Sequence, residues 1–257
     1  MDKKKVIAIT RPFNRIDEAV KIVEEHGSEA FIVPTLELEI INSLSLKKLI
    51  SQIDDLNWLI FTSPTSIESI FHFYPNFNEK INDNIKIAAI GTKTRKTAND
   101  HDLVVDLIPK DFTAEGLIKA MENFPVENQL IGIPRTLEAR DTLPEELKKR
   151  GANVFIAESY KSVIPRDVVR IELLISKILK NEIDAITFTS PLTVKNLFEI
   201  ANDEQVEELK NKLSTSTVSM AIGPITHKVL ENFNITAYYP NRYTVKDMMD
   251  YLFENLL

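Results

Sequence analysis

The chain carries an internal repeat over its whole length, and this repeat restricts the folds open to it. Four motifs return in the second half of the chain in the order in which they occur in the first, and at nearly the same spacing. They predict a tandem duplication of residues 1–127 and 128–257, and a period this long indicates two domains rather than a solenoid. The matching pairs are ITRPFNRID and IPRTLEARD with Arg11 and Arg135, FTSPTSIESIF and FTSPLTVKNLF from Phe61 and Phe188, AAIGTKTRK and MAIGPITHK with Gly91 and Gly223, and FTAEGLIKAM and YTVKDMMDYL from Phe112 and Tyr243.

Short apolar runs alternate with helical periods along both repeats. Runs such as VIAIT, WLIF and MAIG are apolar on both faces, which is typical of strands in a parallel sheet covered by helices. Residues 16–26 and 138–150, which lie between such runs, have the period of an amphipathic helix. The sequence therefore predicts doubly wound α/β domains. The predicted strands cover residues 6–10, 30–33, 58–61, 85–90, 103–108, 129–133, 153–157, 185–188, 218–222 and 235–239.

The repeat also locates a linker. FIVPTLELEI from Phe31 aligns with FIAESYKSVI from Phe155, and both segments are predicted to be extended and partly polar. Two such segments can pair as a ribbon, so that each repeat gives its first βαβ unit to one domain and its remainder to the other. We expect two doubly wound parallel-sheet domains, residues 1–34 with 166–257 and residues 41–156, joined by a two-stranded linker of residues 35–40 and 157–165.

Composition excludes several kinds of chemistry. The 257 residues include no cysteine, which rules out disulfides, thiolate metal sites and cysteine nucleophiles. The six glycines are too widely scattered for either a dinucleotide-binding fingerprint or a phosphate-binding P-loop. The four histidines show no metal-ligand spacing. A net charge of −7 argues against a broad nucleic-acid surface. We therefore predict no metal site and no nucleic-acid partner.

No segment has the length of a membrane span or of an export signal. The basic start MDKKK is followed by an apolar run of residues 6–9 only, before Thr10, Arg11 and Pro12 interrupt it. A signal peptide needs a longer apolar run than this. We expect a soluble cytoplasmic protein without a membrane partner.

Each repeated motif lies where a predicted strand ends and a helix begins. The first turn of a helix presents unpaired N–H groups and the positive end of the helix dipole, and both favour anions. Ligands of open α/β sheets bind at this same edge. The motifs add hydroxyls and cations there. The candidate binding residues are Arg11, Thr62, Ser63, Thr92, Lys93, Thr94, Arg135, Thr189, Ser190, Thr226 and His227.

Each of these residues can instead have an ordinary structural role without any ligand. A serine or threonine at a helix start commonly caps the helix, and a surface cation is commonly solvated. The duplicated set favours binding, because two such edges facing across a cleft would suit a polyanion. His227 is open to either an anion contact or an ordinary surface role.

Tyr160 is the one aromatic hydroxyl in the predicted linker, and its repeat partner is Leu36. A tyrosine in a ribbon commonly serves packing, with its hydroxyl at solvent. At a cleft between domains the phenol can instead donate a proton. The residues alone leave both roles open.

The ordered motifs resemble the uroporphyrinogen-III synthase family over essentially the whole chain, from ITRP to YTVKDMMDYL. Each motif is short, and their combined order is much more specific than any one. At one position the chain departs from the family: Ile225 stands where a second hydroxyl often follows Gly-Pro, so that only its backbone N–H can serve. The residues that carry the resemblance are Thr10-Arg11-Pro12, Phe61-Thr62-Ser63-Pro64, Ala89-Ile90-Gly91 with Thr94, Glu158-Ser159-Tyr160, Thr187-Phe188-Thr189-Ser190-Pro191, and Ala221-Ile222-Gly223-Pro224 with Thr226.

This resemblance implies an active site in a cleft between the two domains. The implied substrate is hydroxymethylbilane, a linear tetrapyrrole with eight carboxylates. The enzyme closes it with inversion of the last pyrrole ring and loss of water through a spirocyclic intermediate, without a cofactor. The resemblance also suggests the acid role for Tyr160, while holding the substrate in a folded pose does most of the remaining work. Hand-over of the substrate by the preceding pathway enzyme stays open.

Two other functions compete with this one. A non-catalytic two-domain protein can close on a small anionic ligand, although Tyr160 favours the enzyme because a simple binder does not need it. A sugar-nucleotide transferase of two α/β domains would need a glycine-rich nucleotide loop, which the chain lacks, and a longer sequence. We expect a monomeric enzyme of the resembled family.

Overall fold

The computed structural model describes residues 4–257, apart from the side chain of Asn14. The chain divides into two compact units, Met1–Glu37 with Val163–Leu257 (unit 1) and Leu38–Ser162 (unit 2). The two boundaries fall inside residues 35–40 and 157–165, the segments predicted as a linker.

Unit 1 is built on a sheet of five parallel strands. Its central strands read VIAI, AITF and VSMA and are almost wholly buried, as expected where helices cover both faces. Ile7 of one strand lies opposite Ala185 of the next. In order across the sheet the strands are β11 (Ala237–Tyr238), β10 (Val218–Ala221), β9 (Ala185–Phe188), β1 (Val6–Ile9) and β2 (Glu29–Ile32).

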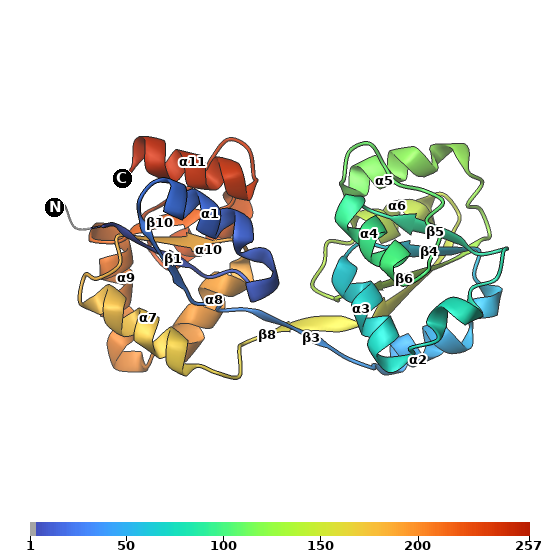
Figure 1. The fold of residues 1–257 in the computed structure, drawn as a ribbon, viewed down its shortest axis with the longest axis horizontal. Coiled ribbons are helices and arrows are strands. Elements are labelled where there is room, and N and C mark those ends of the chain that lie inside the picture. Colours follow the sequence, from blue (N-terminus) through green and yellow to red (C-terminus); the bar gives the residue numbers. More distant parts are fainter. Residues whose placement is uncertain (1–3) are drawn as a thin grey trace. The chain divides into compact units, whose positions relative to one another are not determined.

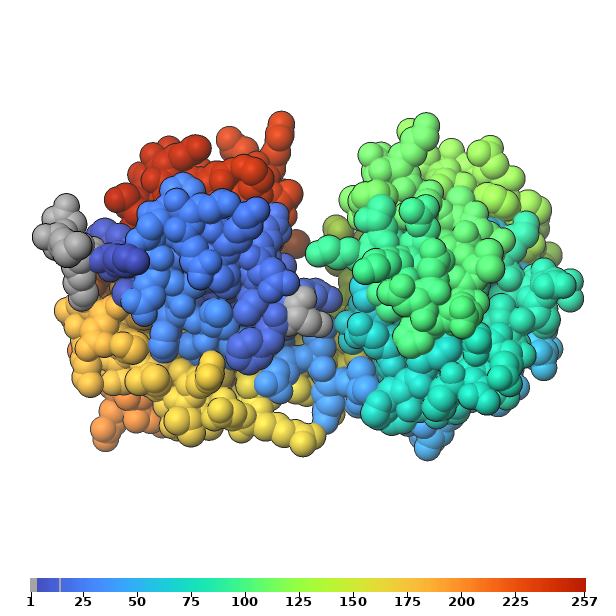
Figure 2. Space-filling model, viewed as in Figure 1, coloured from blue at the N-terminus to red at the C-terminus, as the bar shows by residue number. Residues whose placement is uncertain are grey.

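Alternate side chains of β1 point to opposite faces of this sheet, and each face has its own core. Ile7 packs in one cluster with Met248, on the face covered by α1 (Asp17–Glu25) and α11 (Val245–Asn255). These two helices lie side by side, in blue and red, in Figures 1 and 2. Ala8 packs in the other cluster with Phe188. The helices of that second face are α7 (Val169–Leu179), α8 (Pro191–Ile200), α9 (Asp203–Thr215) and α10 (Pro224–Asn232).

Unit 2 repeats this arrangement with four parallel strands. Across the sheet they are β5 (Lys86–Ala89), β4 (Trp58–Phe61), β6 (Leu130–Arg135) and β7 (Asn153–Glu158). Leu59 and Phe61 pack in one cluster with residues of α2 (Leu44–Ser51), α3 (Pro64–Phe73) and α4 (Thr92–Asp100). Trp58 and Ile60 pack in the other with residues of α5 (Ala114–Ala120) and α6 (Thr142–Lys149). Short 3₁₀ turns complete the two units at Phe13–Arg15 (η1), Ile53–Asp55 (η2), Phe77–Lys80 (η3) and Met121–Asn123 (η4).

The two sheets confirm the predicted fold class, including the exchange between repeats. Unit 1 combines β1 and β2 of the first repeat with β9, β10 and β11 of the second. Unit 2 combines β4 and β5 of the first repeat with β6 and β7 of the second. A separate two-stranded sheet pairs β3 (Glu37–Ile40) with β8 (Tyr160–Val163), as predicted for the linker.

Each sheet has one place where the chain connections leave in opposite directions. In unit 1 the chain passes from β1 outward to β2, and from β9 outward to β10, so this switch point lies between β1 and β9. In unit 2 the switch point lies between β4 and β6. Ligands of open α/β sheets bind beside the carboxyl ends of the strands at such places. The residues that follow these strands are therefore the first to consider for function.

Two predicted strands differ most from the structure. Residues 103–108 form only an isolated bridge between Leu107 and Ala88, because the Asp106 carboxylate takes the N–H of Ile87 (2.7 Å) and Val104 is exposed. Residues 235–239 keep only two residues of strand, Ala237 and Tyr238, at the sheet edge. Within residues 4–257 no helix is both long and apolar enough to cross a membrane.

Candidate functional site

Two helices at matching places in the units begin at a glycine. α4 follows β5 and has Gly91 as its N-cap, and α10 follows β10 and has Gly223. A glycine has no side chain to cap the first turn, and no other side chain caps either helix. The first N–H groups of a helix have no partner within it, so these two turns keep donors for an anion.

The predicted binding residues of these turns differ in exposure. Thr94 and Thr226 are buried in the first turns of α4 and α10, and they add a hydroxyl beside the N–H groups. Thr92 and Lys93 are exposed. Ile225 is exposed as well, and it offers its backbone N–H alone. The two turns can therefore bind carboxylates mainly through backbone and hydroxyl donors.

Serine hydroxyls cap the neighbouring helices. Ser63 Oγ accepts from the N–H of Thr65 (3.1 Å) at the start of α3, and Ser190 Oγ accepts from the N–H of Thr193 (3.3 Å) at the start of α8. The capping role left open by the sequence is thus real for both serines. A hydroxyl that accepts a hydrogen bond still has its own proton to donate. Thr62 and Thr189, which precede these caps, are half-buried.

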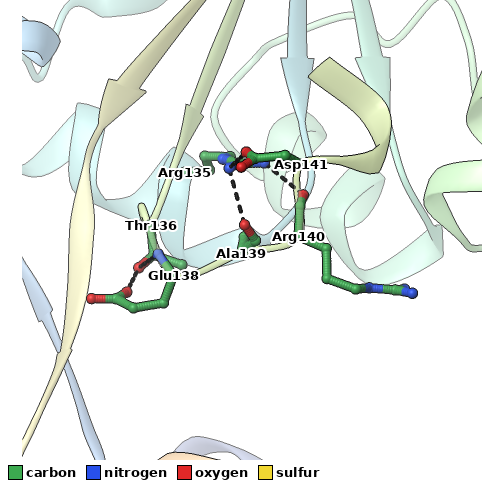
Figure 3. Close-up of polar contacts among 6 residues, drawn as sticks. All are labelled: Arg135, Thr136, Glu138, Ala139, Arg140 and Asp141. Atoms are coloured by element: carbon green, nitrogen blue, oxygen red, sulfur yellow. Dashed lines mark hydrogen bonds and ion pairs between the residues drawn. The ribbon is translucent and has the colours of Figure 1, made fainter. Parts of the chain in front are cut away.

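The guanidinium of Arg135 binds residues of the loop that follows β6, as Figure 3 shows. Its side chain is buried, and its guanidinium donates to the carbonyls of Ala139 (3.0 Å) and Arg140 (2.8 Å) and pairs with Asp141 (2.5 Å). The side chain of Arg140 points away from this cluster and pairs with Glu115 (3.8 Å). Arg135 therefore shapes the loop, which leaves little of its guanidinium for a ligand.

Arg11 occupies the matching position after β1 but has a different environment. It is half-buried, and its Nε, like that of Arg135, is buried without a hydrogen-bond partner. Among residues 4–257, no acidic side chain forms an ion pair with it. Burial lowers the pKa of Arg11, the neighbouring Arg15 lowers it further, and Glu18 opposes this shift. Within the part of the chain that the structure describes, Arg11 is thus a cation that no carboxylate contacts.

His227 connects α10 to β11. Its Nε2 lies 3.0 Å from the carbonyl oxygen of Ala237, and its ring centroid lies 4.9 Å from that of Tyr239. Its Nδ1 lies 3.8 Å from Glu231. Nε2 is thus held by a backbone carbonyl within unit 1, and the anion contact of His227 stays a prediction.

Tyr160 is the first residue of β8 and is only 6% exposed. It follows Ser159, whose carbonyl oxygen accepts from the N–H of Ile41 (2.9 Å) and from the hydroxyl of Ser69 in α3 (2.5 Å). The backbone at Tyr160 is therefore fixed to the first helix after β4, and burial fixes the ring.

The sequence analysis did not identify the residues that hold the two segments leaving the sheets, at Thr35 in unit 1 and at Ser159 in unit 2. Thr35 in unit 1 is the repeat partner of Ser159, and its carbonyl oxygen accepts from Asn196 Nδ2 (2.7 Å). The Thr35 hydroxyl donates to the carbonyl of Thr193 (2.9 Å). Asn196 and Ser69 occupy the same place in the two copies of the motif that begins with FTSP, so the repeat itself was the signal that could have found both anchors.

The structure gathers most of the predicted residues at one sheet edge in each unit. In unit 1, Arg11 follows β1, Thr189 and Ser190 follow β9, and residues 225–227 follow β10. In unit 2 the matching set follows β4, β5 and β6, since parallel strands end at the same edge. Tyr160 lies outside both of these sheets, on β8. Within the described residues no cluster of acids and histidines could hold a metal ion. Each edge thus offers hydrogen-bond donors and cations, which suit carboxylates.

Comparison with known proteins decides the family. The sequence model described as "Uroporphyrinogen-III synthase HemD" matches residues 17–250. The chain belongs to the uroporphyrinogen-III synthase family. A protein of Methanothermobacter thermautotrophicus that is provisionally named uroporphyrinogen-III synthase is 44% identical over 243 residues, which cover 95% of both chains. The uroporphyrinogen-III synthase of Chlorobaculum parvum is 23% identical over 90% of each.

Solved structures of uroporphyrinogen-III synthases share the fold. That from Helicobacter pylori has a TM-score of 0.67 at 16% identity and covers 98% of this chain and 99% of its own. A mutant enzyme from Thermus thermophilus has a TM-score of 0.59 at 18% identity and covers 91% of each chain. The resemblance drawn from the motifs is confirmed. The family is one of lyase-type enzymes of tetrapyrrole synthesis.

Proposed function

We propose that this chain converts hydroxymethylbilane into uroporphyrinogen III, closing the ring with inversion of the last pyrrole and loss of water. The observation that carries the proposal is the family match over residues 17–250. The glycine-started turns of α4 and α10 support a polycarboxylate substrate, because each offers several donors and neither is capped by a side chain.

Short-range donors carry substrate affinity. The net charge of −7 gives no general attraction for an octa-anion, and salt screens what long-range field remains. Backbone N–H groups and hydroxyls act at contact distance and need no net charge. Arg11 adds one cation whose charge no described carboxylate pairs.

The reaction needs one proton moved to oxygen, two carbon–carbon bonds formed and one carbon–carbon bond broken. The hydroxymethyl carbon–oxygen bond breaks as the pyrrole nitrogen pushes out the hydroxyl, which takes a proton and leaves as water. The freed methylene carbon bonds to the last ring at the carbon that already carries the bridge to the neighbouring pyrrole, which gives the spirocyclic intermediate. That older bridge bond then breaks and re-forms at the free α-carbon of the same ring, and this carbon loses its proton, so the net change is the loss of one water. We assign the proton donation to Tyr160, whose neutral phenol is held in a fixed segment.

Isomer analysis of the product tests this proposal. The full chain is mixed with hydroxymethylbilane, and the uroporphyrinogen isomers are separated. Unaided closure gives the I isomer, so we expect the III isomer to predominate only with the protein present. If the folded protein yields the I isomer alone, the proposal is wrong. A non-catalytic anion binder would give that same result while still binding polycarboxylates.

A further inference from the structure

Two aromatic side chains at matching repeat positions are largely exposed. Phe112 of unit 2 is 55% exposed, and Tyr243 of unit 1 is 58% exposed. They open the two copies of one repeated motif, FTAEGLIKAM and YTVKDMMDYL. A single exposed aromatic needs no explanation. Two at the same place in two diverged copies indicate a shared use.

Both rings lie against the helix starts that keep free donors. A Cβ added to Gly91 would lie 3.4 Å from the Cβ and Cγ atoms of Phe112. A Cβ added to Gly223 would lie 3.1 Å from the Cγ and Cδ1 atoms of Tyr243. Each ring therefore contacts the backbone of the glycine N-cap, beside the first turn of α4 or α10. The 3.1 Å at Gly223 is tighter than an ordinary Cβ contact, so glycine is favoured there, whereas the 3.4 Å at Gly91 is an ordinary contact distance.

The residue after each ring fixes the backbone. Thr113 Oγ1 accepts from the N–H of Gly116 (3.0 Å) and caps α5. Thr244 Oγ1 accepts from the N–H of Asp247 (3.1 Å) and caps α11. The exposed rings thus project from capped helix starts, so their exposure is built into the fold rather than being a feature of a loose end.

The same edges carry a second pair of exposed apolar side chains. Phe13 follows β1 and Leu137 follows β6, the strands that border the two switch points. They too match in the repeat, since each stands two residues after the matched Arg11 or Arg135. Each edge therefore combines apolar surface with donors for anions, which fits a ligand that is itself apolar in its skeleton and anionic in its side arms.

We infer that Phe112 and Tyr243 position the substrate by contacting its pyrrole rings while its carboxylates take the first-turn N–H groups of α4 and α10. This inference rests on the proposed function and adds two residues to its site. A pyrrole is flat and aromatic, and aromatic pairs gain from stacked or edge contacts beyond the area that they bury. A carboxylate arm on the same pyrrole can reach the adjacent donors.

Alanine variants of the full chain test the inference. Phe112→Ala and Tyr243→Ala should each raise KM for hydroxymethylbilane about 3–10-fold, the effect of one lost aromatic contact, with a smaller change in kcat. Phe112→Tyr and Tyr243→Phe, which keep the ring, should restore KM to within about twofold. Val104→Ala and Val169→Ala are the controls, because these side chains are 79% and 66% exposed and neither is among the atoms nearest to Gly91 or Gly223.

Binding of uroporphyrin III, an oxidised and flat octacarboxylate, gives a readout that is independent of turnover. Its dissociation constant should rise for both alanine variants and stay unchanged for both valine controls. If the wild-type chain forms the III isomer while both alanine variants keep KM and probe affinity within twofold, the positioning role is wrong and the proposed function stands. If the wild-type chain forms only the I isomer, the proposed function fails. In that case the affinity of the two alanine variants for uroporphyrin III alone tests whether Phe112 and Tyr243 contact a tetrapyrrole.

Discussion

The hydroxyl of Ser69 donates a 2.5 Å hydrogen bond to the carbonyl oxygen of Ser159, the residue before Tyr160. Asn196 makes the matching contact to Thr35 in unit 1, at 2.7 Å. In both units a side chain of the helix after the central strand thus holds the segment that leaves the sheet. Only unit 2 follows this anchor with a tyrosine, because the residue after Thr35 is Leu36. The duplication supplied the anchor twice, and the phenol is present in one copy.

Tyr160→Phe should keep the fold and lower kcat about a hundredfold, with a modest effect on KM. A general acid is worth about 10²–10⁴ in rate, and the low end is expected because the pyrrole nitrogen itself drives out the hydroxyl. The rate of III-isomer formation measures this effect. A variant that keeps more than half of the wild-type kcat would show that Tyr160 only packs, which its burial alone also allows.

Ser69→Ala should lower the free energy of unfolding by about 1 kcal/mol, the low end for a buried acceptor that loses one partner. The low end applies because the N–H of Ile41 still donates to the Ser159 carbonyl. We also expect kcat to fall by less than about tenfold, since Tyr160 is then held less firmly. Urea unfolding measures the free energy of unfolding, and the rate of III-isomer formation measures kcat.

The control for Ser69→Ala is Ser51→Ala, because the exposed Ser51 hydroxyl donates only to the carbonyl of Lys48 within its own helix. This control should leave both stability and kcat unchanged. If Ser69→Ala behaves like the control in both measurements, the anchor does not position Tyr160.

The repeat and the apolar strands predicted the two sheets, because both signals depend only on residue type and spacing. The roles of Arg11 and Arg135 could not be predicted in this way. Asp17 and Asp141 stand at matching positions after the two arginines. Asp141 is the N-cap residue of α6 and pairs with Arg135, whereas Asp17 is already the first residue of α1. A shift of one residue in the helix start decides the contact.

The predicted strand at residues 103–108 failed for a related reason. Its composition suits a strand, but a side-chain carboxylate replaces the backbone partner of Ile87. Most of the predicted binding residues lie at the sheet edges, because the ends of the strands could be predicted from the sequence, and their binding role stays a prediction. Whether Ser63 caps a helix, or His227 holds a carbonyl, depends on local geometry that the residue types leave open.

Methionine substitutions should distinguish the roles of Arg11 and Arg135, since methionine keeps an apolar stem without the charge. Arg135→Met should lower the free energy of unfolding by about 2–4 kcal/mol, because two carbonyls and Asp141 lose a buried charged donor. Arg11→Met should leave stability unchanged or raise it. The lowered pKa of Arg11 means that folding disfavours its charge, and an arginine stays charged throughout the neutral range.

The functional effects of the same two variants should be reversed. Arg11→Met should raise KM for hydroxymethylbilane about tenfold, the scale of one hydrogen bond to a charged group. Arg135→Met should change KM little in the protein that remains folded. Denaturant unfolding gives the free energy of unfolding of each variant, and steady-state kinetics give its KM. A stability loss confined to Arg11→Met, or a KM effect confined to Arg135→Met, would contradict the assignment.

The buried hydroxyls of the glycine-started turns give the most direct test of substrate binding by short-range donors. Thr94→Val and Thr226→Val keep the shape of the side chain and remove only the hydroxyl. Each should weaken substrate binding by about 0.5–1.5 kcal/mol, which is a rise in KM of about 2–12-fold. Thr97→Val is the control in α4, because the Thr97 hydroxyl donates to the carbonyl of Lys93 at 3.2 Å. Equal KM values for all three variants and the wild type would show that these hydroxyls do not bind the substrate, and Arg11 with the backbone N–H groups would then carry the affinity.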